Sequence, residues 1–142
     1  MSDNNIDMPP DILSSSEFGQ GIDIVEIARI DQLVRDWGSR FTNRIYTSRE
    51  LAICAGKPTS LAGRFAAKEA FVKAIGTGLR GMNWTDIEII KHRNGRPYFV
   101  LHAGAESEFM RAGWRSCSLA ISHAGGAAIA VVTVSKDKGI AS

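Results

Sequence analysis

The 142-residue chain has little net charge, few cysteines and prolines, and no long apolar segment. Its formal net charge of +2 is too small to indicate general nucleic-acid binding. Its longest apolar runs fall far short of the roughly 20 residues that cross a membrane. Residues 1–16 are polar and contain two prolines, which does not match a secretory signal. We therefore expect a cytoplasmic protein with neither a nucleic-acid nor a membrane partner.

Several chemical signatures are also missing. The two cysteines, Cys54 and Cys117, form neither a CxxC pair nor a zinc-binding spacing, so we expect two reduced thiols in the core. The chain contains no GxxxxGK[ST] phosphate loop and no GxGxxG dinucleotide motif. No local signature marks a serine or cysteine nucleophile. Phosphate chemistry, if present, must use another arrangement of residues.

The length fits one domain, and a hydrophobic fraction of 44% is typical of globular proteins. We expect a disordered tail over 1–16, one catalytic domain over 17–136 and a short tail over 137–142. Hydrophobic spacing predicts helices over 24–37, from Thr47 (a capping box), over 60–75 and over 105–112, and strands over 18–22, 84–91, 98–101, 117–122 and 127–134. This order predicts an α+β fold with a long central helix packed on a mainly antiparallel sheet.

The predicted central helix is apolar nearly all round and yet carries four charges, Arg64, Lys68, Glu69 and Lys73. Its glycine and alanines lie on one side, where another backbone can approach closely. A helix without a wide polar face is usually buried, and buried charges need partners. An anionic ligand bound together with a cation is one way to supply them.

Asp23 and Glu69 are the candidate metal ligands. Asp23 precedes a predicted helix and has Glu26 three residues later, so it is also a natural N-cap, and the two roles are compatible. Glu69 and Lys73 lie four residues apart, which is also the spacing of a surface ion pair. A diphosphate held by Lys68 and Lys73, with Mg²⁺ bridging it to the carboxylates, accounts for these charges.

His123 follows an apolar strand and precedes Gly125-Gly126, so we predict it in a tight turn. A histidine there is often a structural hydrogen-bonding residue, but backbone N–H groups of such a turn also bind phosphate oxygens. Gly76 and Gly78 end the central helix and are a weak phosphate signal.

Three segments in order resemble the holo-[acyl-carrier-protein] synthase family, the small bacterial branch of the 4′-phosphopantetheinyl transferases. They are Gly21–Ile30 (GIDIVEIARI), Leu61–Phe71 (LAGRFAAKEAF) and Ile121–His123 (ISH). The resemblance implies transfer of the phosphopantetheine arm of coenzyme A to a serine of an apo acyl carrier protein, in support of fatty acid biosynthesis. It also implies release of adenosine 3′,5′-bisphosphate, a requirement for Mg²⁺, and a homotrimer with interfacial active sites.

The resemblance assigns roles to individual residues. It implies metal binding by Asp23 and Glu69, and coenzyme A phosphate contacts by Lys73 and His123. Arg64 and the Gly76 turn help to shape the nucleotide pocket. Arg29 faces the acidic carrier protein.

The chain departs from the family pattern where Ala124 replaces a frequent threonine, and where Asp36 and Trp37 replace frequent basic residues. Arg35, Arg40 and Arg44 are the candidates to compensate for the last two.

As a mechanism, we expect Glu69 to act as general base, directly or through a metal-bound water, with Lys73 adding positive charge. Two alternatives remain open at this point. One is a non-catalytic binding module for coenzyme A or another nucleotide diphosphate. The other is a structural oligomer in which Lys68 and Glu69 pair across subunits; physics alone permits either a dimer or a trimer.

Overall fold

The computed structural model describes residues 17–137, so the predicted tails over 1–16 and 138–142 lie outside the described residues. The elements in chain order are β1 (Phe18–Glu26), α2 (Ile27–Trp37), α3 (Ser39–Ile45), α4 (Ser48–Cys54), α5 (Pro58–Ile75), a 3₁₀ turn (Trp84–Asp86), β2 (Ile87–Lys91), β3 (Pro97–Leu101), α6 (Ala103–Arg111), β4 (Ser116–Ala124) and β5 (Ala127–Ser135). The predicted α+β class is confirmed.

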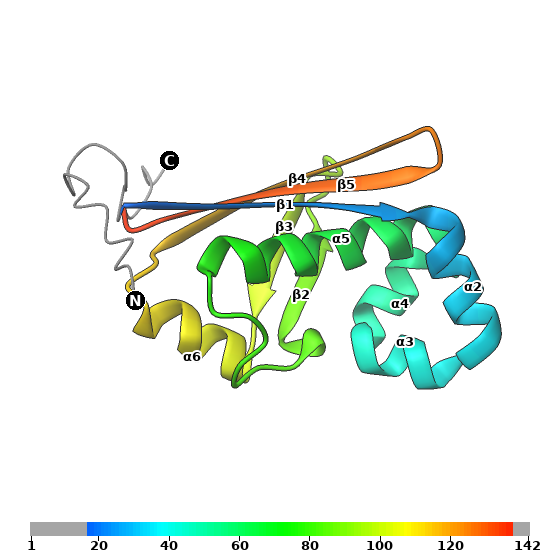
Figure 1. Ribbon diagram of the computed structural model, residues 1–142, viewed down its shortest axis with the longest axis horizontal. Helices are drawn as coiled ribbons and strands as arrows, with labels where there is room; N and C mark the ends of the chain where they lie inside the picture. Colours follow the sequence, from blue (N-terminus) through cyan, green and yellow to red (C-terminus); the bar gives the residue numbers. More distant parts are fainter. Residues whose placement is uncertain (1–16, 138–142) are drawn as a thin grey trace, which may run out of the picture.

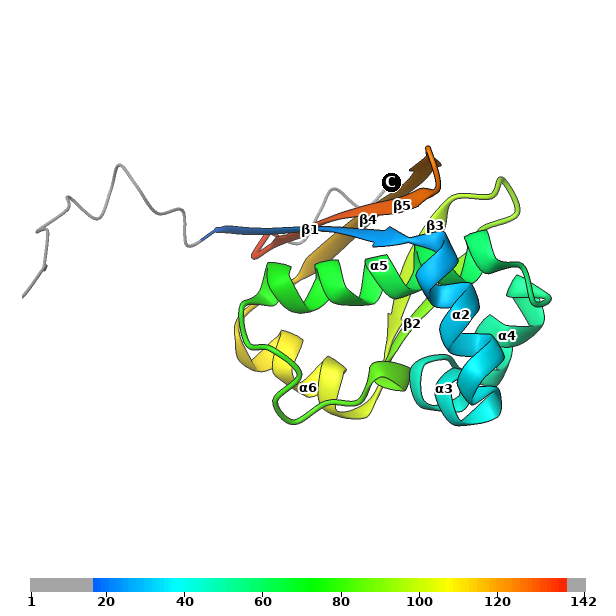
Figure 2. The ribbon, with the colours of Figure 1, turned by 45° about the vertical axis from the view of Figure 1, so that its right-hand side comes forward.

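The strands form two antiparallel sheets, one of three strands in the order β1-β5-β4 and one hairpin, β2-β3. The long helix α5 runs along one face of the three-stranded sheet (Figure 1). Helices α2 to α4 gather near its N-terminal end and α6 near its C-terminal end, as both ribbon views show (Figure 2). The central helix therefore has neighbours on nearly every side, which explains its lack of a polar face.

Strand β1 is longer than the sequence pattern indicates and corrects one assignment. The pattern predicts a strand that ends at Ile22 and a helix from Ile24, but β1 pairs with β5 as far as Glu26 and α2 begins at Ile27. Asp23 therefore lies within the strand opposite Ala130 and is not a helix N-cap. Pairing with β5 prevails over the helical spacing because the ladder supplies backbone hydrogen bonds to β1 along its whole length on the side that faces β5.

The close approach predicted for one side of the central helix is confirmed, with β1 as the neighbour. A β-carbon added to Gly21 would lie 1.9 Å from the backbone oxygen of Ala70, a separation that atoms cannot adopt. Ala66, Ala67 and Ala70 on α5 are fully buried. Small residues on both elements thus set the distance between strand and helix.

The ends of several elements follow their sequence signals. Thr47 forms the predicted capping box with Glu50, in which each side chain accepts the other residue's backbone N–H. Gly76 ends α5 with a left-handed φ of 74°. Helix α5 starts at Pro58, two residues before the predicted start, because proline suits the first position of a helix.

Two further details differ from the predictions. Gly38 ends the preceding helix as predicted, but its φ of 54° redirects the chain directly into α3, a helix that the sequence did not predict. His123 is a residue of β4 opposite Ala128, and the tight turn consists of Gly125 and Gly126.

None of the helices formed by residues 17–137 has the length and hydrophobicity needed to cross a membrane.

Candidate active site

Lys68 takes no part in a ligand site, which corrects the expectation that it holds a diphosphate. Its ammonium group is fully buried and lies 2.6 Å from Glu50 Oε1, and it also donates to the backbone oxygens of Ile45 and Trp84. Glu50 in turn accepts from the N–H of Ile89. The pair joins α4, α5 and β2 within one chain. This contact contradicts a structural oligomer built on Lys68 pairing across subunits.

Glu88 is a second buried carboxylate. Its position between the apolar residues Ile87 and Ile89 of β2 would suggest that it lies on the polar face of the strand. It is 2% exposed and accepts hydrogen bonds from Thr47, Arg49 and His102. Burial alone raises the pKa of Glu88, but these hydrogen bonds outweigh it and hold the pKa at about 2. Glu88 therefore remains ionised and joins β2 to α4 and to the start of α6.

Asp23 and Lys73 form the ion pair that connects β1 to α5. Lys73 Nζ lies 3.1 Å from Asp23 Oδ1 and donates to the backbone oxygen of Ile22 at 3.1 Å. The Asp23 side chain is 16% exposed, whereas that of Lys73 is 55% exposed. Lys73 is therefore reachable from solvent while its ammonium group stays beside a partly buried carboxylate.

Glu69 faces the same place from α5. Burial raises the pKa of Glu69, and the negative charge of Asp23 raises it further, while the positive charges of Lys73 and Arg29 lower it. Asp23 and Glu69 therefore interact electrostatically although they lie far apart in the sequence. Glu69 and Lys73 form no salt bridge among the described residues. Lys73 pairs with Asp23 instead, so the alternative of an i, i+4 surface ion pair does not hold.

Arg64 and His123 line a separate hollow of about 210 Å³ on the other side of α5. Arg64 is 3% exposed, and its Nε donates to the backbone oxygen of Ile89 at 3.3 Å. Its Nη2 is buried and has no hydrogen-bond partner within the described part of the chain. His123 is exposed, and Lys91, Gly95 and Pro97 complete one wall. A buried unpaired guanidinium nitrogen and an exposed imidazole suit an anion.

The structure thus divides the predicted site residues into two groups. Asp23, Glu69 and Lys73 meet between β1 and α5. Arg64 lies 180° around the helix from Lys73, because nine residues at 100° each bring the side chain to the opposite side. Gly76 follows one turn after Lys73 and ends α5. No group of three or more histidine, cysteine or acidic side chains suited to a metal occurs within residues 17–137.

The buried carboxylates Glu50 and Glu88 are the residues that sequence reasoning missed. A signal existed for Glu50, because the capping box that begins α4 requires a glutamate at this position. Nothing in the local sequence of β2 distinguishes Glu88 from a surface residue, since it alternates with the apolar residues Ile87 and Ile89 as a solvent-facing side chain would.

A model of the 4′-phosphopantetheinyl transferase superfamily matches residues 19–132 of the chain. Holo-[acyl-carrier-protein] synthase from Geobacter sp. (strain M21) is 42% identical over 84% of this chain and 98% of that protein. The protein of the same name from Koribacter versatilis is 45% identical over 81% of this chain and 95% of its own length.

Solved structures agree with these sequence relatives. Holo-[acyl-carrier-protein] synthase from Helicobacter pylori, in complex with coenzyme A, superposes with a TM-score of 0.75 at 38% identity and covers 82% of this chain and 99% of that one. The enzyme from Neisseria meningitidis gives a TM-score of 0.77 at 39% identity, covering 83% and 98%.

Proposed function

The chain belongs to the holo-[acyl-carrier-protein] synthase family of 4′-phosphopantetheinyl transferases, and from this premise we propose that Asp23, Glu69 and Lys73 form its catalytic centre. As a member of this family, the chain transfers the 4′-phosphopantetheine group of coenzyme A to a serine of apo acyl carrier protein. Adenosine 3′,5′-bisphosphate is the other product. We propose that the reaction serves fatty acid biosynthesis in the cytoplasm.

The paired carboxylates support a Mg²⁺ site. Burial, and then the negative charge of Asp23, raise the pKa of Glu69, and a divalent cation bound by the two carboxylates would offset their repulsion. Mg²⁺ commonly takes one or two protein carboxylates, with phosphate oxygens and waters as its other ligands, so Asp23 and Glu69 suffice. When bound there, Mg²⁺ supplies charge neutralisation for the diphosphate and for the departing bisphosphate.

The remaining chemistry belongs to side chains that are already in place. The carrier serine hydroxyl attacks the β-phosphorus of coenzyme A, the P–O bond to the bisphosphate breaks, and the serine proton is removed. Glu69 is the proposed general base, because its raised pKa makes its carboxylate a stronger base than that of an ordinary glutamate. Lys73, exposed at its ammonium end, adds positive charge to the phosphate region.

We propose that a complete site needs two copies of the chain. The phosphate-binding candidates Arg64 and His123 line a hollow on the opposite side of α5 from Lys73, so one copy does not bring them together. The outer face of the three-stranded sheet also carries uncovered apolar side chains, Ile22 (56% exposed), Ile24 (63%) and Val131 (38%). A copy packed on this face would bury them. A homotrimer, the assembly that the family resemblance favours, satisfies both observations.

We propose that the acyl carrier protein approaches along α2. Arg29 lies near enough to Glu69 to lower its pKa, so this end of the helix borders the catalytic centre. Farther along the chain, Trp37 is 56% exposed beside Arg40 and Arg44 in a hollow of about 370 Å³. These two arginines form no ion pair within the described residues, whereas Arg35 is neutralised by Asp31 at 3.0 Å. Arg40 and Arg44, rather than Arg35, are therefore the free positive charges for an acidic carrier helix.

The observation that carries the proposal is the 3.1 Å ion pair between Asp23 of β1 and Lys73 of α5, with Glu69 one turn before Lys73 on the same helix. It is tested by incubating the protein with apo carrier protein, coenzyme A and Mg²⁺ and following the carrier by mass spectrometry. We expect a mass gain of one phosphopantetheine group that is lost on chelation of the metal. Glu69→Gln should lower turnover by at least ~100-fold, the contribution typical of a general base.

Glu106→Gln is the matched control, because Glu106 is an exposed glutamate on α6, a helix that carries none of the proposed catalytic residues. Binding of coenzyme A without any mass gain would instead favour the non-catalytic binding module. Full turnover by Glu69→Gln would remove Glu69 from the mechanism.

A further inference from the structure

Helix α5 meets β1 through a repeat of small residues. On this side of the helix, alanine recurs at every fourth position: Ala62, Ala66, Ala70 and Ala74. On the strand, Gly21 lies against the backbone of Ala70, and Gly19 lies against the backbone oxygen of Ala74. Four residues of a helix rise about 6 Å and two residues of a strand span about 6.7 Å, so the two repeats have nearly the same length. The small residues therefore set the distance between β1 and α5 but not the register between them.

The register decides where the proposed catalytic groups lie. In the structure, Lys73 Nζ is 3.1 Å from Asp23 Oδ1, and Glu69 is one helical turn earlier on α5. A slip by one turn would place Ala66 against Gly21 with the same close approach. It would also move Glu69 and Lys73 about 6 Å along β1, which would break the ion pair with Asp23. These groups therefore need a contact that distinguishes one turn of α5 from the next.

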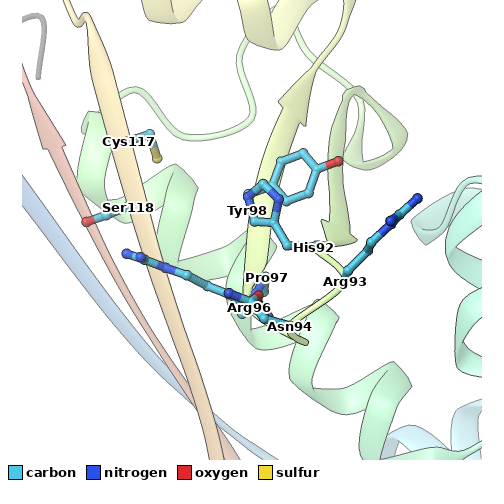
Figure 3. A pocket seen from close by; sticks show the side chains of 8 residues that line it. All are labelled: His92, Arg93, Asn94, Arg96, Pro97, Tyr98, Cys117 and Ser118. Carbon is cyan, nitrogen blue, oxygen red and sulfur yellow. Dashed lines mark hydrogen bonds between the residues drawn. The ribbon is translucent and has the colours of Figure 1, made fainter. Parts of the chain in front are cut away.

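Most other contacts of α5 are apolar and discriminate poorly between registers. Phe71, for example, packs against the rings of Phe99 and Phe109. Apolar cores tolerate repacking and lose a unique arrangement before they lose stability. Near the first turns of α5, a hollow of about 680 Å³ lies between the hairpin tip at 92–97 and β4, so the two sheets do not close around the helix there (Figure 3).

Lys68 supplies a contact that does discriminate. Its ammonium group is fully buried and has three acceptors: Glu50 Oε1 at 2.6 Å, the backbone oxygen of Ile45 at 2.6 Å and that of Trp84 at 3.1 Å. These acceptors come from α4, the end of α3 and the 3₁₀ turn, so together they define one position for the ammonium group. A slip by one turn would leave both members of the ion pair buried and unpaired, which is strongly destabilising.

We propose that the buried pair of Lys68 and Glu50 fixes the register of α5 on β1, and thereby the position of Glu69. Lys68 is thus a positioning residue, which acts on the reaction through its neighbour in the chain. This inference rests on the proposed function, because that function gives Glu69 its importance. Replacing a buried ion pair with uncharged residues of similar volume is often neutral or stabilising, so stability alone does not explain these charges. The need for a single register does.

The test removes both charges at once. In the core double variant, Glu50→Gln with Lys68→Met, glutamine keeps an acceptor oxygen for the capping box of α4, and methionine keeps most of the length of the lysine side chain. Each single variant leaves one buried charge unpaired, so its midpoint of urea unfolding should fall by roughly 1–3 M. The core double variant should recover most of that loss.

The register is read from NOE cross-peaks that join the α-protons of Gly21 to protons of Ala70 and Ala74. In the wild type we expect these cross-peaks alone. In the core double variant we expect additional cross-peaks to Ala66, or broadened signals from α5. We also expect its kcat to fall at least ~10-fold, since a displacement of about 1 Å can cost ~100-fold in rate.

Glu108→Gln with Arg111→Met is the matched control, because it removes an ion pair of the same 2.6 Å length from the exposed surface of α6. It should change neither the cross-peaks nor kcat. Wild-type cross-peaks in the core double variant would overturn the proposal, whether or not kcat falls. If that variant does not fold, Lys68→Gln gives the same readout, because its amide still donates a hydrogen bond to Glu50. Failure of both to fold would mean that the pair serves stability, and would overturn the proposal as well.

The cross-peaks report the register without any reaction, so they separate this inference from the proposed function. An inactive wild type, together with a shifted register in the core double variant, would refute the proposed function and support the role of the pair. An active wild type whose register does not depend on the pair would do the reverse.

Discussion

The pKa of Glu69 depends on three charged neighbours that come from three different elements. Asp23 on β1 raises it, and Lys73 on α5 and Arg29 on α2 lower it, in addition to the raising effect of burial. The helix alone would place only Lys73 near Glu69, at the i, i+4 spacing. The pKa of Glu69 therefore depends on the packing of β1 and α2 against α5.

Asp23→Asn is expected to lower the pKa of Glu69 in the metal-free protein, because it removes the negative charge that opposes ionisation. Lys73→Ala is expected to raise it for the opposite reason. The measurement is a ¹³C NMR titration of the Glu69 side-chain carboxyl group. Unchanged pKa values in both variants would mean that the three side chains do not share one site.

The buried pair of Lys68 and Glu50 shows what a charged residue in an apolar helix can mean. Both side chains are fully buried, and each is satisfied by the other and by backbone groups. Removing one member would leave an unpaired charge in the core, which typically costs 3–5 kcal/mol or about half the stability of a small domain. The role of Lys68 is thus structural, although from the sequence it resembles its functional neighbours on α5.

At the scale of elements, the contact between β1 and α5 determines where Asp23 and Lys73, two of the proposed catalytic residues, meet. Two glycines of β1, Gly19 and Gly21, lie against backbone atoms of Ala74 and Ala70. This close approach brings the Asp23 carboxylate within 3.1 Å of the Lys73 ammonium group. A side chain at Gly21 would separate the two elements and with them the two carboxylates.

Gly21→Ala is expected to destabilise the fold by about 2–3 kcal/mol, the upper part of the usual range for overpacking, because its β-carbon has no space beside Ala70. Urea unfolding measures the change. Ser107→Ala, at an exposed position of α6, serves as the control and should stay within about 0.5 kcal/mol of the wild type. Equal stability of the two variants would show that β1 and α5 are not held as closely as described.

Glu88 connects elements in a second place and gives the fold a dependence on acid. Its folded pKa of about 2 is below the roughly 4.3 of an unfolded glutamate. Its contribution to stability is therefore fully present above the unfolded value and is lost as the pH falls from about 5 toward 2.

We expect the wild-type protein to lose about 2–3 kcal/mol of stability from this group over that interval. Glu88→Gln should lose less over the same interval, because it has no carboxylate to protonate. Urea unfolding at a series of pH values measures both slopes, and Glu106→Gln is the control. Parallel slopes for wild type and Glu88→Gln would contradict the lowered pKa.

At the scale of the whole molecule, the division of the candidate site between two sides of α5 has a direct consequence. A cyclic assembly with heterologous contacts can bring the Arg64 and His123 side of one copy to the Glu69 side of the next. The uncovered apolar face at Ile22, Ile24 and Val131 is a surface on which such copies can pack.

Mixing two inactive variants tests this arrangement. Glu69→Gln and His123→Ala, unfolded together and refolded as mixed oligomers, should recover activity at roughly a quarter of the sites, since those sites receive a native residue from each copy. Each variant treated alone is the control and should stay inactive. Absence of recovery, with mixed oligomers demonstrated by mass spectrometry, would place the whole site within one chain.

Sequence signals alone correctly predicted the α+β class, the long central helix and its end at Gly76, the capping box at Thr47 and the membership in a transferase family. These follow from local signals: hydrophobic spacing, a helix cap, left-handed glycines and ordered motifs. The charges of the central helix and the family resemblance also predicted that Asp23, Glu69 and Lys73 act together, and their catalytic role stays a prediction.

The packing of distant segments determines which charges form buried pairs and which remain open to solvent. Lys68 and Lys73 lie on the same helix, five residues apart, and differ because one meets Glu50 in the core and the other meets Asp23 near the surface. Asp23 lies in a strand because β5 pairs with it, and Glu88 is buried because three side chains from other elements surround it. Such contacts join residues distant in the chain, so no local pattern records them.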